Sequence, residues 1–486
     1  MKISKYHLVF LLFTILLLPK LTIANNYYLL IGGGPSLSES QSSIEQNVIW
    51  SEKIIRHKHP DSEIRIFYAD GDNPDPDIVN HLRVTAPDAG LLPFDRIFSE
   101  EADPKEYYNH TIENVTGTTA PQFMKPIILD DFKKLTNNDR VLILYNGHGG
   151  YAPDDLSNNY LRLWGEKKLT VYDFESMLSV IKPDIPVRYI MTQCFSGGFT
   201  NAIHPNADKE TFELTGNRCG FMSQSSRRES EGCTASLNIG DYRDYSTYFF
   251  AAIDGKTRQN TPLKSNPDLN NDSIVSLREA HLYTLATAFS SDLSRTTSED
   301  YLEKWEPWYL RWISDTKRQK ESIYYEIALK LAANNEFDTA MLNNPSELRK
   351  LRSSLLKAYR KLSRENNEVN KKIKAIQDEI KEKLSDSFPD LKDAYKSNFS
   401  GYDNQRLDEA KKTILQYERY SELKHLFSHR DEVVTPLIES KRKLVQAEKM
   451  FRLLKLAKLD SLLPIFSNNE IRSNFSKLLA CENTSL

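Results

Sequence analysis

The chain has 486 residues, of which 40% are apolar and 27% are charged, values typical of globular proteins. Its 64 Lys and Arg nearly balance 67 Asp and Glu, so the net charge of −3 excludes a general attraction to nucleic acid or to anionic membranes. Four cysteines without zinc-site spacing leave the fold to be held mainly by its core. At roughly 100–200 residues per domain, we expect two or three domains.

The first 24 residues have the pattern of a secretory signal peptide. Lys2 and Lys5 precede an apolar run at 8–18, and the small residue Ala24 ends the segment. The run is shorter than the roughly 20 residues of a membrane-spanning helix, so we favour a cleaved signal over a retained anchor. The mature chain would start near Asn25 as a secreted or periplasmic protein without a stable membrane span.

Residues 25–298 alternate between short apolar runs and stretches of helical period. Five runs are typical of buried strands: Tyr27–Ile31, Ile64–Tyr68, Val141–Tyr145, Val187–Thr192 and Gly220–Ser223. Stretches between them predict helices: Ile44–Ile55, Phe123–Leu135 and Val171–Ile181. This alternation predicts an α/β domain with a mainly parallel sheet flanked by helices. Functional groups in such sheets gather at the carboxyl ends of the strands.

Residues 299–486 are predicted to form an all-α extension. Of the 18 glycines only Gly401 lies beyond residue 300, and the segment is rich in Lys, Glu, Leu and Arg. Apolar residues step by three and four from 348 to 384, which predicts a helix of about 40 residues that starts at Asn344 and ends before Pro389.

Two further periodic stretches, 407–427 and 437–459, would fold back on this long helix. We favour a self-contained helical hairpin or three-helix bundle over an intermolecular coiled coil. Binding of a partner or self-association through this tail stays open.

A histidine and a cysteine each follow a predicted strand in a glycine-flanked turn. His148 stands in the segment 146–150 (Asn-Gly-His-Gly-Gly), and Cys194 in the segment 193–198 (Gln-Cys-Phe-Ser-Gly-Gly). Neighbouring parallel strands bring such termini together, so the two can approach although 46 positions separate them. A thiol that attacks an acyl carbon needs a partner that raises its thiolate fraction, and imidazole is the usual one. The amides of Gly149 and Cys194 would donate to a developing oxyanion.

These two motifs together resemble the caspase-like (clan CD) cysteine peptidases, which include caspases, metacaspases, legumains and gingipains. The resemblance covers roughly residues 27 to 290. It implies an α/β sandwich in which His148 is the general base or proton donor, Cys194 is the nucleophile, and Gly149 with Cys194 forms the oxyanion hole. It also implies hydrolysis of protein or peptide substrates through a thioester acyl-enzyme, with no cofactor required for catalysis.

Four residues near this dyad are candidates for the substrate pocket. Thr192 and Gln193 directly precede Cys194, and metacaspases and legumains carry an acidic residue where Thr192 stands, which argues against cleavage after Arg or Lys. Arg227 and Arg228 could line a pocket for an acidic group or form a solvated basic turn. The main alternative to an enzyme is a secreted, non-catalytic interaction protein that presents its helical tail to a partner.

The segment 268–279 resembles the twelve-residue calcium loop, so calcium is a candidate cofactor. Oxygen-bearing side chains stand at positions 1, 3, 5, 9 and 12 of that loop, namely Asp268, Asn270, Asp272, Ser276 and Glu279. Ser273 replaces the usual glycine, where a positive φ costs a residue with a Cβ about 1 kcal/mol. The alternative is a helix start in which Ser276 is the N-cap and Glu279 completes a capping box.

A second acidic segment follows the second predicted strand. Four aspartates fall within the eight positions 70–77. This loop could bind Ca²⁺ or attract a basic substrate, although acidic loops interrupted by Pro and Gly are more often solvated turns.

Cysteine spacing suggests one disulfide bond. Cys219 and Cys233 lie 14 positions apart around a polar segment, and in an oxidising compartment their pairing would stabilise the fold by about 3 kcal/mol. Cys194 would then be free for catalysis, and Cys481 would be left over.

Overall fold

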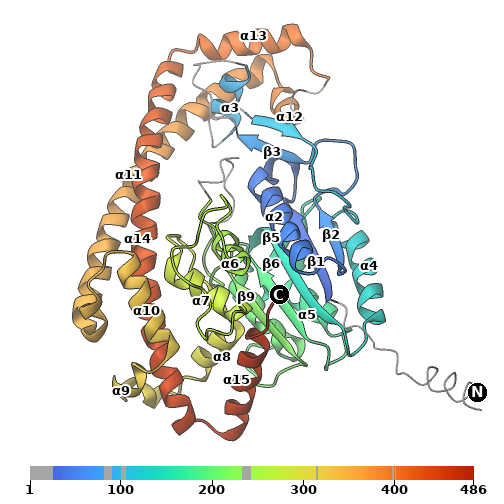
Figure 1. Ribbon diagram of the computed structural model, residues 1–486. Coiled ribbons are helices and arrows are strands. Elements are labelled where there is room, and N and C mark those ends of the chain that lie inside the picture. Colours follow the sequence, from blue (N-terminus) through green and yellow to red (C-terminus); the bar gives the residue numbers. More distant parts are fainter. Residues whose placement is uncertain are drawn as a thin grey trace, which may run out of the picture.

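The computed structural model describes residues 26–81, 90–99, 105–231, 242–313, 316–396, 399 and 401–486 (Figure 1). The chain folds as an α/β protein with a mainly parallel central sheet flanked by helices and with a helical C-terminal region. The signal peptide predicted at residues 1–24 lies outside the described residues. Within the described ranges, no helix is both long enough and apolar enough to cross a membrane.

The central sheet contains the five predicted strands, all parallel to one another. In spatial order they are β9 (Arg218–Met222), β8 (Val187–Met191), β5 (Arg140–Gly150), β1 (Asn26–Gly33) and β2 (Glu63–Tyr68). A short antiparallel strand, β10 (Arg295–Thr296), adds to β9, and the hairpin of β6 (Tyr160–Leu163) and β7 (Lys167–Thr170) pairs with the end of β5. Strands β8 and β9 are buried throughout, which explains their mainly apolar sequences; each also carries one buried arginine, Arg188 and Arg218.

Helices cover both faces of the sheet and divide the side chains of each strand. One face packs against α4 (Pro121–Lys134) and α5 (Val171–Leu178), and the other packs against α2 (Ser42–Lys58), α6 (Tyr245–Asp254) and α7 (Leu277–Thr287). Tyr27 and Leu29 of β1 point to the first layer, while Tyr28 and Leu30 point to the second. This period of two within an apolar run is the mark of a strand buried on both sides.

Two very long helices form an antiparallel hairpin along one side of the molecule (Figure 1). They are α11 (Pro345–Ser387) and α14 (Tyr420–Phe466), of 43 and 47 residues. Arg352 pairs with Glu448 and Arg419 with Glu379, which fixes their opposite directions. The start of α11 is as predicted, because the Asn344 side chain accepts hydrogen bonds from the first-turn amides.

The two later periodic stretches differ from the prediction in their limits. The first corresponds to α13 (Asn404–Leu415), and α14 begins at Tyr420 rather than after Pro436. Pro436 lies inside α14, so the apolar period is interrupted there although the helix continues.

The hairpin is not a self-contained bundle. Its outer end packs on α3 (Leu92–Phe98), and the remaining half of α14 shares the main core with α8 (Thr297–Trp305), α9 (Thr316–Gln319) and α10 (Ile323–Asn334). The domain boundary expected between residues 298 and 299 falls within α8. The short α12 (Leu391–Lys396) closes the outer end, and α15 (Asn469–Glu482) returns to the sheet.

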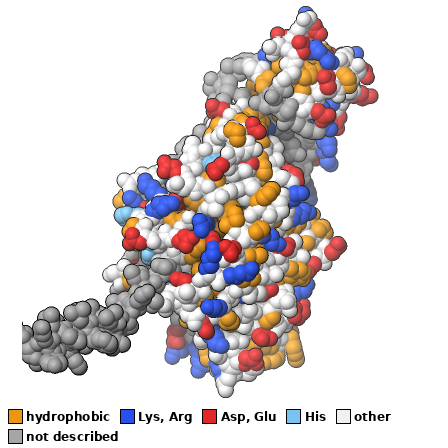
Figure 2. Space-filling view, turned by 90° about the vertical axis from the view of Figure 1, so that its right-hand side faces the viewer, with side chains coloured by type: hydrophobic (Ala, Val, Ile, Leu, Met, Phe, Trp, Pro, Cys, Tyr) orange, Lys and Arg blue, Asp and Glu red, His pale blue; other side chains and the backbone are white. Residues whose placement is uncertain are grey.

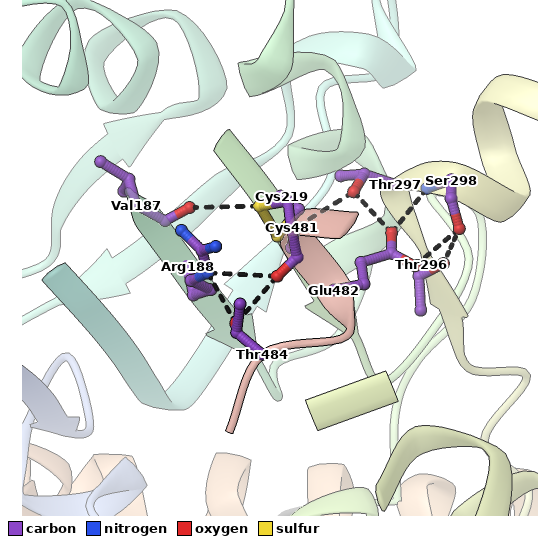
Figure 3. The surroundings of a disulfide bond; sticks show 10 residues. Val187, Arg188, Cys219, Thr296, Thr297, Ser298, Cys481, Glu482 and Thr484 are labelled. Atoms are coloured by element: carbon purple, nitrogen blue, oxygen red, sulfur yellow. Dashed lines mark hydrogen bonds between the residues drawn. A yellow bond between two sulfur atoms is a disulfide. The ribbon is translucent and has the colours of Figure 1, made fainter. Parts of the chain in front are cut away.

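The C-terminus is joined covalently to the sheet (Figure 3). Cys219 of β9 forms a disulfide bond with Cys481 of α15, with 5.9 Å between their Cα atoms. The predicted pairing of Cys219 with Cys233 is therefore wrong, and Cys233 lies outside the described residues. Beside this bond, the carboxylate of Glu482 accepts hydrogen bonds from the amide and hydroxyl of Ser298, at the start of α8. The final helix thus fastens the tail to the beginning of β9 in the central sheet rather than leaving it independent.

The side of the molecule in Figure 2 carries acidic and basic side chains intermingled, with hydrophobic groups between them. This distribution agrees with the nearly balanced charge of the sequence. The face drawn therefore presents mixed rather than single-sign charge.

Candidate active site

The sheet places the His148 and Cys194 segments at neighbouring strand ends. In the register between β5 and β8, Val141 is opposite Val187 and Tyr145 is opposite Met191, an offset of 46 positions. His148 and Cys194 have the same offset and follow the last paired residues by three positions each. The register thus brings the two segments to neighbouring strand ends, as expected from the sequence, while catalysis by the two residues stays a prediction.

Close backbone contact explains the glycine that follows the histidine. A Cβ added to Gly149 would lie 2.1 Å from the carbonyl oxygen of Cys194 and 2.6 Å from Cγ of Gln193. Only a residue without a side chain fits there. The segment of the histidine and the turn of the cysteine are therefore in direct contact.

The chain turns sharply immediately after the cysteine. Phe195 has φ of 59° and ψ of 18°, a left-handed conformation that a residue with a Cβ adopts at a cost. Asn159 holds this turn by donating from Nδ2 to the carbonyl oxygens of Phe195 and Ser226, at 3.0 and 2.9 Å. The conformation of the turn is thus imposed by its neighbours.

His148 is oriented by two acceptors from the segment after β1. Its Nε2 lies 2.8 Å from the carbonyl oxygen of Glu39 and 2.7 Å from Oε1 of Gln41. A backbone carbonyl can only accept, so Nε2 carries the proton and Nδ1 is the basic nitrogen. Burial lowers the pKa of His148, which keeps the imidazole neutral at neutral pH. A neutral, oriented imidazole is what a general base requires.

The thiol of Cys194 is covered in this conformation. Its Sγ accepts a hydrogen bond from the amide of Ser230 at 3.2 Å and lies 3.9 Å from the carbonyl oxygen of the same residue. Burial raises the pKa of Cys194 to about 11, against the lowering effect of the Ser230 amide. Cys194 is the free cysteine of the described part of the chain, and in this state it is a protonated thiol.

The residues over the thiol belong to the segment 226–231, which we call the cover loop. The carbonyl oxygen of Arg228 accepts from the amide of Phe195 at 2.9 Å. Asp292 accepts at one oxygen from the hydroxyl of Ser230 and from the amide of Glu231, at 2.9 and 2.7 Å. The cover loop is therefore fixed both to the cysteine turn and to the segment before β10.

Helix α14 clamps this loop from outside. Arg442 donates from Nε to Glu231 at 2.7 Å, and Arg228 forms an ion pair with Glu448 at 2.6 Å. Burial lowers the pKa of Lys449, the residue after Glu448, to about 8. The helical region thus contacts the residues that cover the candidate nucleophile, which the sequence did not suggest.

The four predicted pocket residues have different environments. Thr192 is buried, and its hydroxyl donates to the carbonyl oxygen of Tyr145 and lies 2.9 Å from Oδ1 of Asn146. Gln193 is also buried, while Arg228 is engaged by helix α14. Of the four, Arg227 lines a cavity of about 660 Å³.

That cavity begins directly after the cysteine turn. Gly197 and Gly198 line it together with charged residues of both signs, among them Arg295, Asp300 and Lys304. Its lining is too mixed in charge to favour one substrate class. Of the residues predicted for the pocket, Arg227 alone is among those that line this cavity.

The calcium-like loop uses its carboxylates to organise its own backbone. Asp268 accepts from the amides of Asn271 and Ser273, at 2.7 and 2.9 Å. Glu279 accepts from the amide and hydroxyl of Ser276 at 2.9 and 2.8 Å, completing the capping box that was the alternative prediction. Ser273 has the positive φ, 69°, that the calcium-loop pattern requires. Calcium binding through Asp268, Asn270, Asp272, Ser276 and Glu279 stays a prediction.

Comparison with known proteins adds no functional assignment. No protein-family profile matches the chain, and no curated protein matches it. Among solved structures the chain is similar to protein GSU0716 from Geobacter sulfurreducens, with 11% identity, a TM-score of 0.26, and coverage of 44% of this chain and 77% of that one. This similarity is too weak to carry an argument, so function must be argued from the site.

Proposed function

We propose that the protein is an exported, caspase-like cysteine peptidase in which Cys194 is the nucleophile and His148 the general base. The observation that carries the proposal is the shared strand register of the two residues, together with a histidine whose Nε2 proton is fixed by Glu39. This leaves Nδ1 as the basic nitrogen for the thiol. A substrate would be a protein or peptide, with no cofactor needed for the reaction.

The reaction would proceed by acyl transfer to the thiol. Cys194 Sγ, having given its proton to His148, attacks the carbonyl carbon of the peptide bond, and the amides of Gly149 and Cys194 donate to the oxyanion. Collapse of this intermediate breaks the C–N bond, and His148 protonates the departing amine. Water, deprotonated by His148, then hydrolyses the thioester and restores the thiol.

The covered state of the thiol favours one alternative. A protein whose cysteine is buried and protonated could act as a non-catalytic interaction module. Trp308 and Trp312, which precede α9, are 73% and 84% exposed and would suit binding of a partner through the helical region. In that case the dyad would be without function.

Cleavage of a mixed peptide library, followed by mass spectrometry, separates the two proposals. The full-length mature chain and Arg442→Ala, in which the clamp on the cover loop is removed, are compared with Cys194→Ala and His148→Ala. His57→Ala is the matched control, because His57 is an exposed histidine of α2. We expect cleavage that both dyad variants lose and the control retains. Cleavage that survives Cys194→Ala would show that Cys194 is not the nucleophile. No cleavage by either protein with an intact dyad would support the interaction module instead.

A further inference from the structure

The aspartate loop after β2 is not a simple solvated turn. Asp70 and Asp77 converge with His110, which follows β4 (Lys105–Tyr108), and one potential ligand atom from each lies within 4.8 Å of the others. Asp77 is only 1% exposed, whereas Asp72 and Asp75 of the same loop are exposed. The fold therefore brings two of the four aspartates close to a histidine that the sequence pattern did not indicate.

Asp77 and His110 are held firmly relative to each other. The amide of His110 donates to Asp77 Oδ1 and its Nδ1 lies 2.8 Å from Asp77 Oδ2. The amide of Asp77 in turn donates to the carbonyl oxygen of Tyr108 at 3.2 Å. Strands β3 (Ile78–His81) and β4 pair antiparallel directly beside these residues. Two of the three groups are thus fixed by the backbone as well as by their own contact.

The backbone also fixes Asp70. Ala69 has a positive φ of 35°, its amide donates to the carbonyl oxygen of Gly32 at 3.1 Å, and its own carbonyl oxygen accepts from Thr119 at 2.9 Å. A Cβ at Gly71 would lie 2.6 Å from the amide nitrogen of Thr118. The turn therefore has one conformation, and it aims Asp70 toward Asp77 and His110.

Among the described residues, no hydrogen bond to Oδ1 accounts for the position of Asp70. Its Oδ1 is buried and makes no hydrogen bond to any described residue. Burial and the charge of Asp77 raise the pKa of Asp70 to about 7. A second buried oxygen, the hydroxyl of Tyr68, is likewise without a hydrogen bond of normal geometry in the described part of the chain, and its ring packs 5.2 Å from that of His110. Two orphaned oxygens border the same three groups.

We propose that Asp70, Asp77 and His110 form a binding site for a divalent transition-metal ion of the Zn²⁺ or Mn²⁺ class. Ligand atoms around one such ion at about 2.1 Å lie within about 4.2 Å of one another, so the present spacing requires only small side-chain movements. The ion replaces the proton between His110 and Asp77 and neutralises the two carboxylates. One imidazole nitrogen and two carboxylate oxygens favour a transition metal over Ca²⁺ or Mg²⁺, which prefer oxygen ligands alone.

The site is independent of the proposed peptidase activity. It lies beyond β2, at the edge of the sheet, whereas His148 lies near the end of β5 and Cys194 follows β8. Asp70 is partly exposed, which gives an ion a route of entry. Metal binding displaces protons from its ligands, so the affinity for the ion should fall as the pH is lowered.

Calorimetric titration tests the proposal. It uses the full-length, metal-free chain with the substitution Cys194→Ala, which removes the thiol as a competing ligand. ZnCl₂, MnCl₂ and CaCl₂ are each titrated at pH 7.5 into this protein and into its Asp70→Asn and Asp72→Asn variants. We expect one Zn²⁺ or Mn²⁺ per chain, a Kd at least tenfold higher in Asp70→Asn, and a change of less than twofold in Asp72→Asn, whose carboxylate is exposed.

Thermal unfolding of the metal-free proteins shows whether weaker metal binding by Asp70→Asn results from a folding defect. Asp70 Oδ1 accepts no hydrogen bond within the described ranges, so Asp70→Asn should unfold at the same or a higher temperature than its parent. Absence of saturable Zn²⁺ and Mn²⁺ binding, binding that Asp70→Asn leaves unchanged, or a site that takes Ca²⁺ alone would each overturn the proposal. A lower unfolding temperature in metal-free Asp70→Asn would equally contradict it, because it would show that Asp70 has a structural partner.

Discussion

Removing the clamp between α14 and the cover loop should expose the candidate nucleophile. Arg442→Ala deletes the ion pair that holds Glu231. Glu231 follows Ser230, and the amide of Ser230 donates a hydrogen bond to the thiol of Cys194. Glu231 would keep its hydrogen bond from the amide of Ser291. The substitution therefore loosens the loop without removing any group that touches the thiol.

The size of the effect follows from two quantities. Burial raises the pKa of Cys194 from 9.0 to about 11, and two units correspond to about a hundredfold lower thiolate fraction at neutral pH. That factor is the upper limit of what complete opening can restore. Arg442 and Glu231 are 18% and 16% exposed, so their pair is partly buried and its loss favours opening by about 1–2 kcal/mol. A change of this size corresponds to about five- to thirtyfold in an equilibrium constant.

Alkylation with iodoacetamide at pH 7.5, with labelled peptides quantified by mass spectrometry, measures the accessible thiolate directly. We expect Cys194 in Arg442→Ala to react about five to thirty times faster than in the unaltered chain. Arg419→Ala is the matched control, because Arg419 pairs with Glu379 and Glu422 at the far end of the same hairpin. An equal rate in Arg442→Ala and the unaltered chain would refute the argument that α14 keeps the loop closed.

Three further predictions concern the site contact, the disulfide bond and a buried carboxyl group. Gly149→Ala should lose turnover and about 1–3 kcal/mol of stability in urea, because its Cβ would lie 2.1 Å from the carbonyl oxygen of Cys194; a stable, active variant would contradict this. Digestion without reductant should yield a peptide of Cys219 linked to that of Cys481, and any other partner would disprove the pairing. Burial raises the pKa of Glu482 from 4.5 to about 7, so its contribution to stability is present at low pH and fades between about pH 4.5 and 7. Glu482→Gln should therefore weaken the decline in stability over this range, by up to about 1 kcal/mol per pH unit, and unchanged urea titrations from pH 5 to 8 would contradict the assignment.

The local parts of the fold could be predicted because local residues determine them. The apolar run Tyr27–Ile31 fits a strand buried on both faces, and the His148 and Cys194 segments lie at the ends of two further strands of this kind. Parallel pairing then fixes the register of their ends. The α11 helix could likewise be predicted from its apolar stripe and its Asn344 N-cap.

Contacts between distant segments escaped the sequence analysis. Cys481 lies 262 positions from Cys219, and no spacing pattern links them, whereas Cys233 is close in sequence. His110 completes the aspartate cluster only because β3 and β4 pair beside it. The cover loop over Cys194 is a polar segment with no local signal, since its position depends on a helix more than 200 residues further along the chain.

Trapping of an acyl-enzyme tests the central claim most directly. The loop-opened Arg442→Ala protein is mixed with a peptide ester as acyl donor, quenched in acid, and examined by intact-mass and peptide mass spectrometry. The account predicts a single acyl adduct on Cys194 that forms much more slowly when His148→Ala is added and is absent from Cys194→Ala. An accessible thiol that forms no adduct, or one that forms it equally fast without the histidine, would contradict the assignment of the dyad.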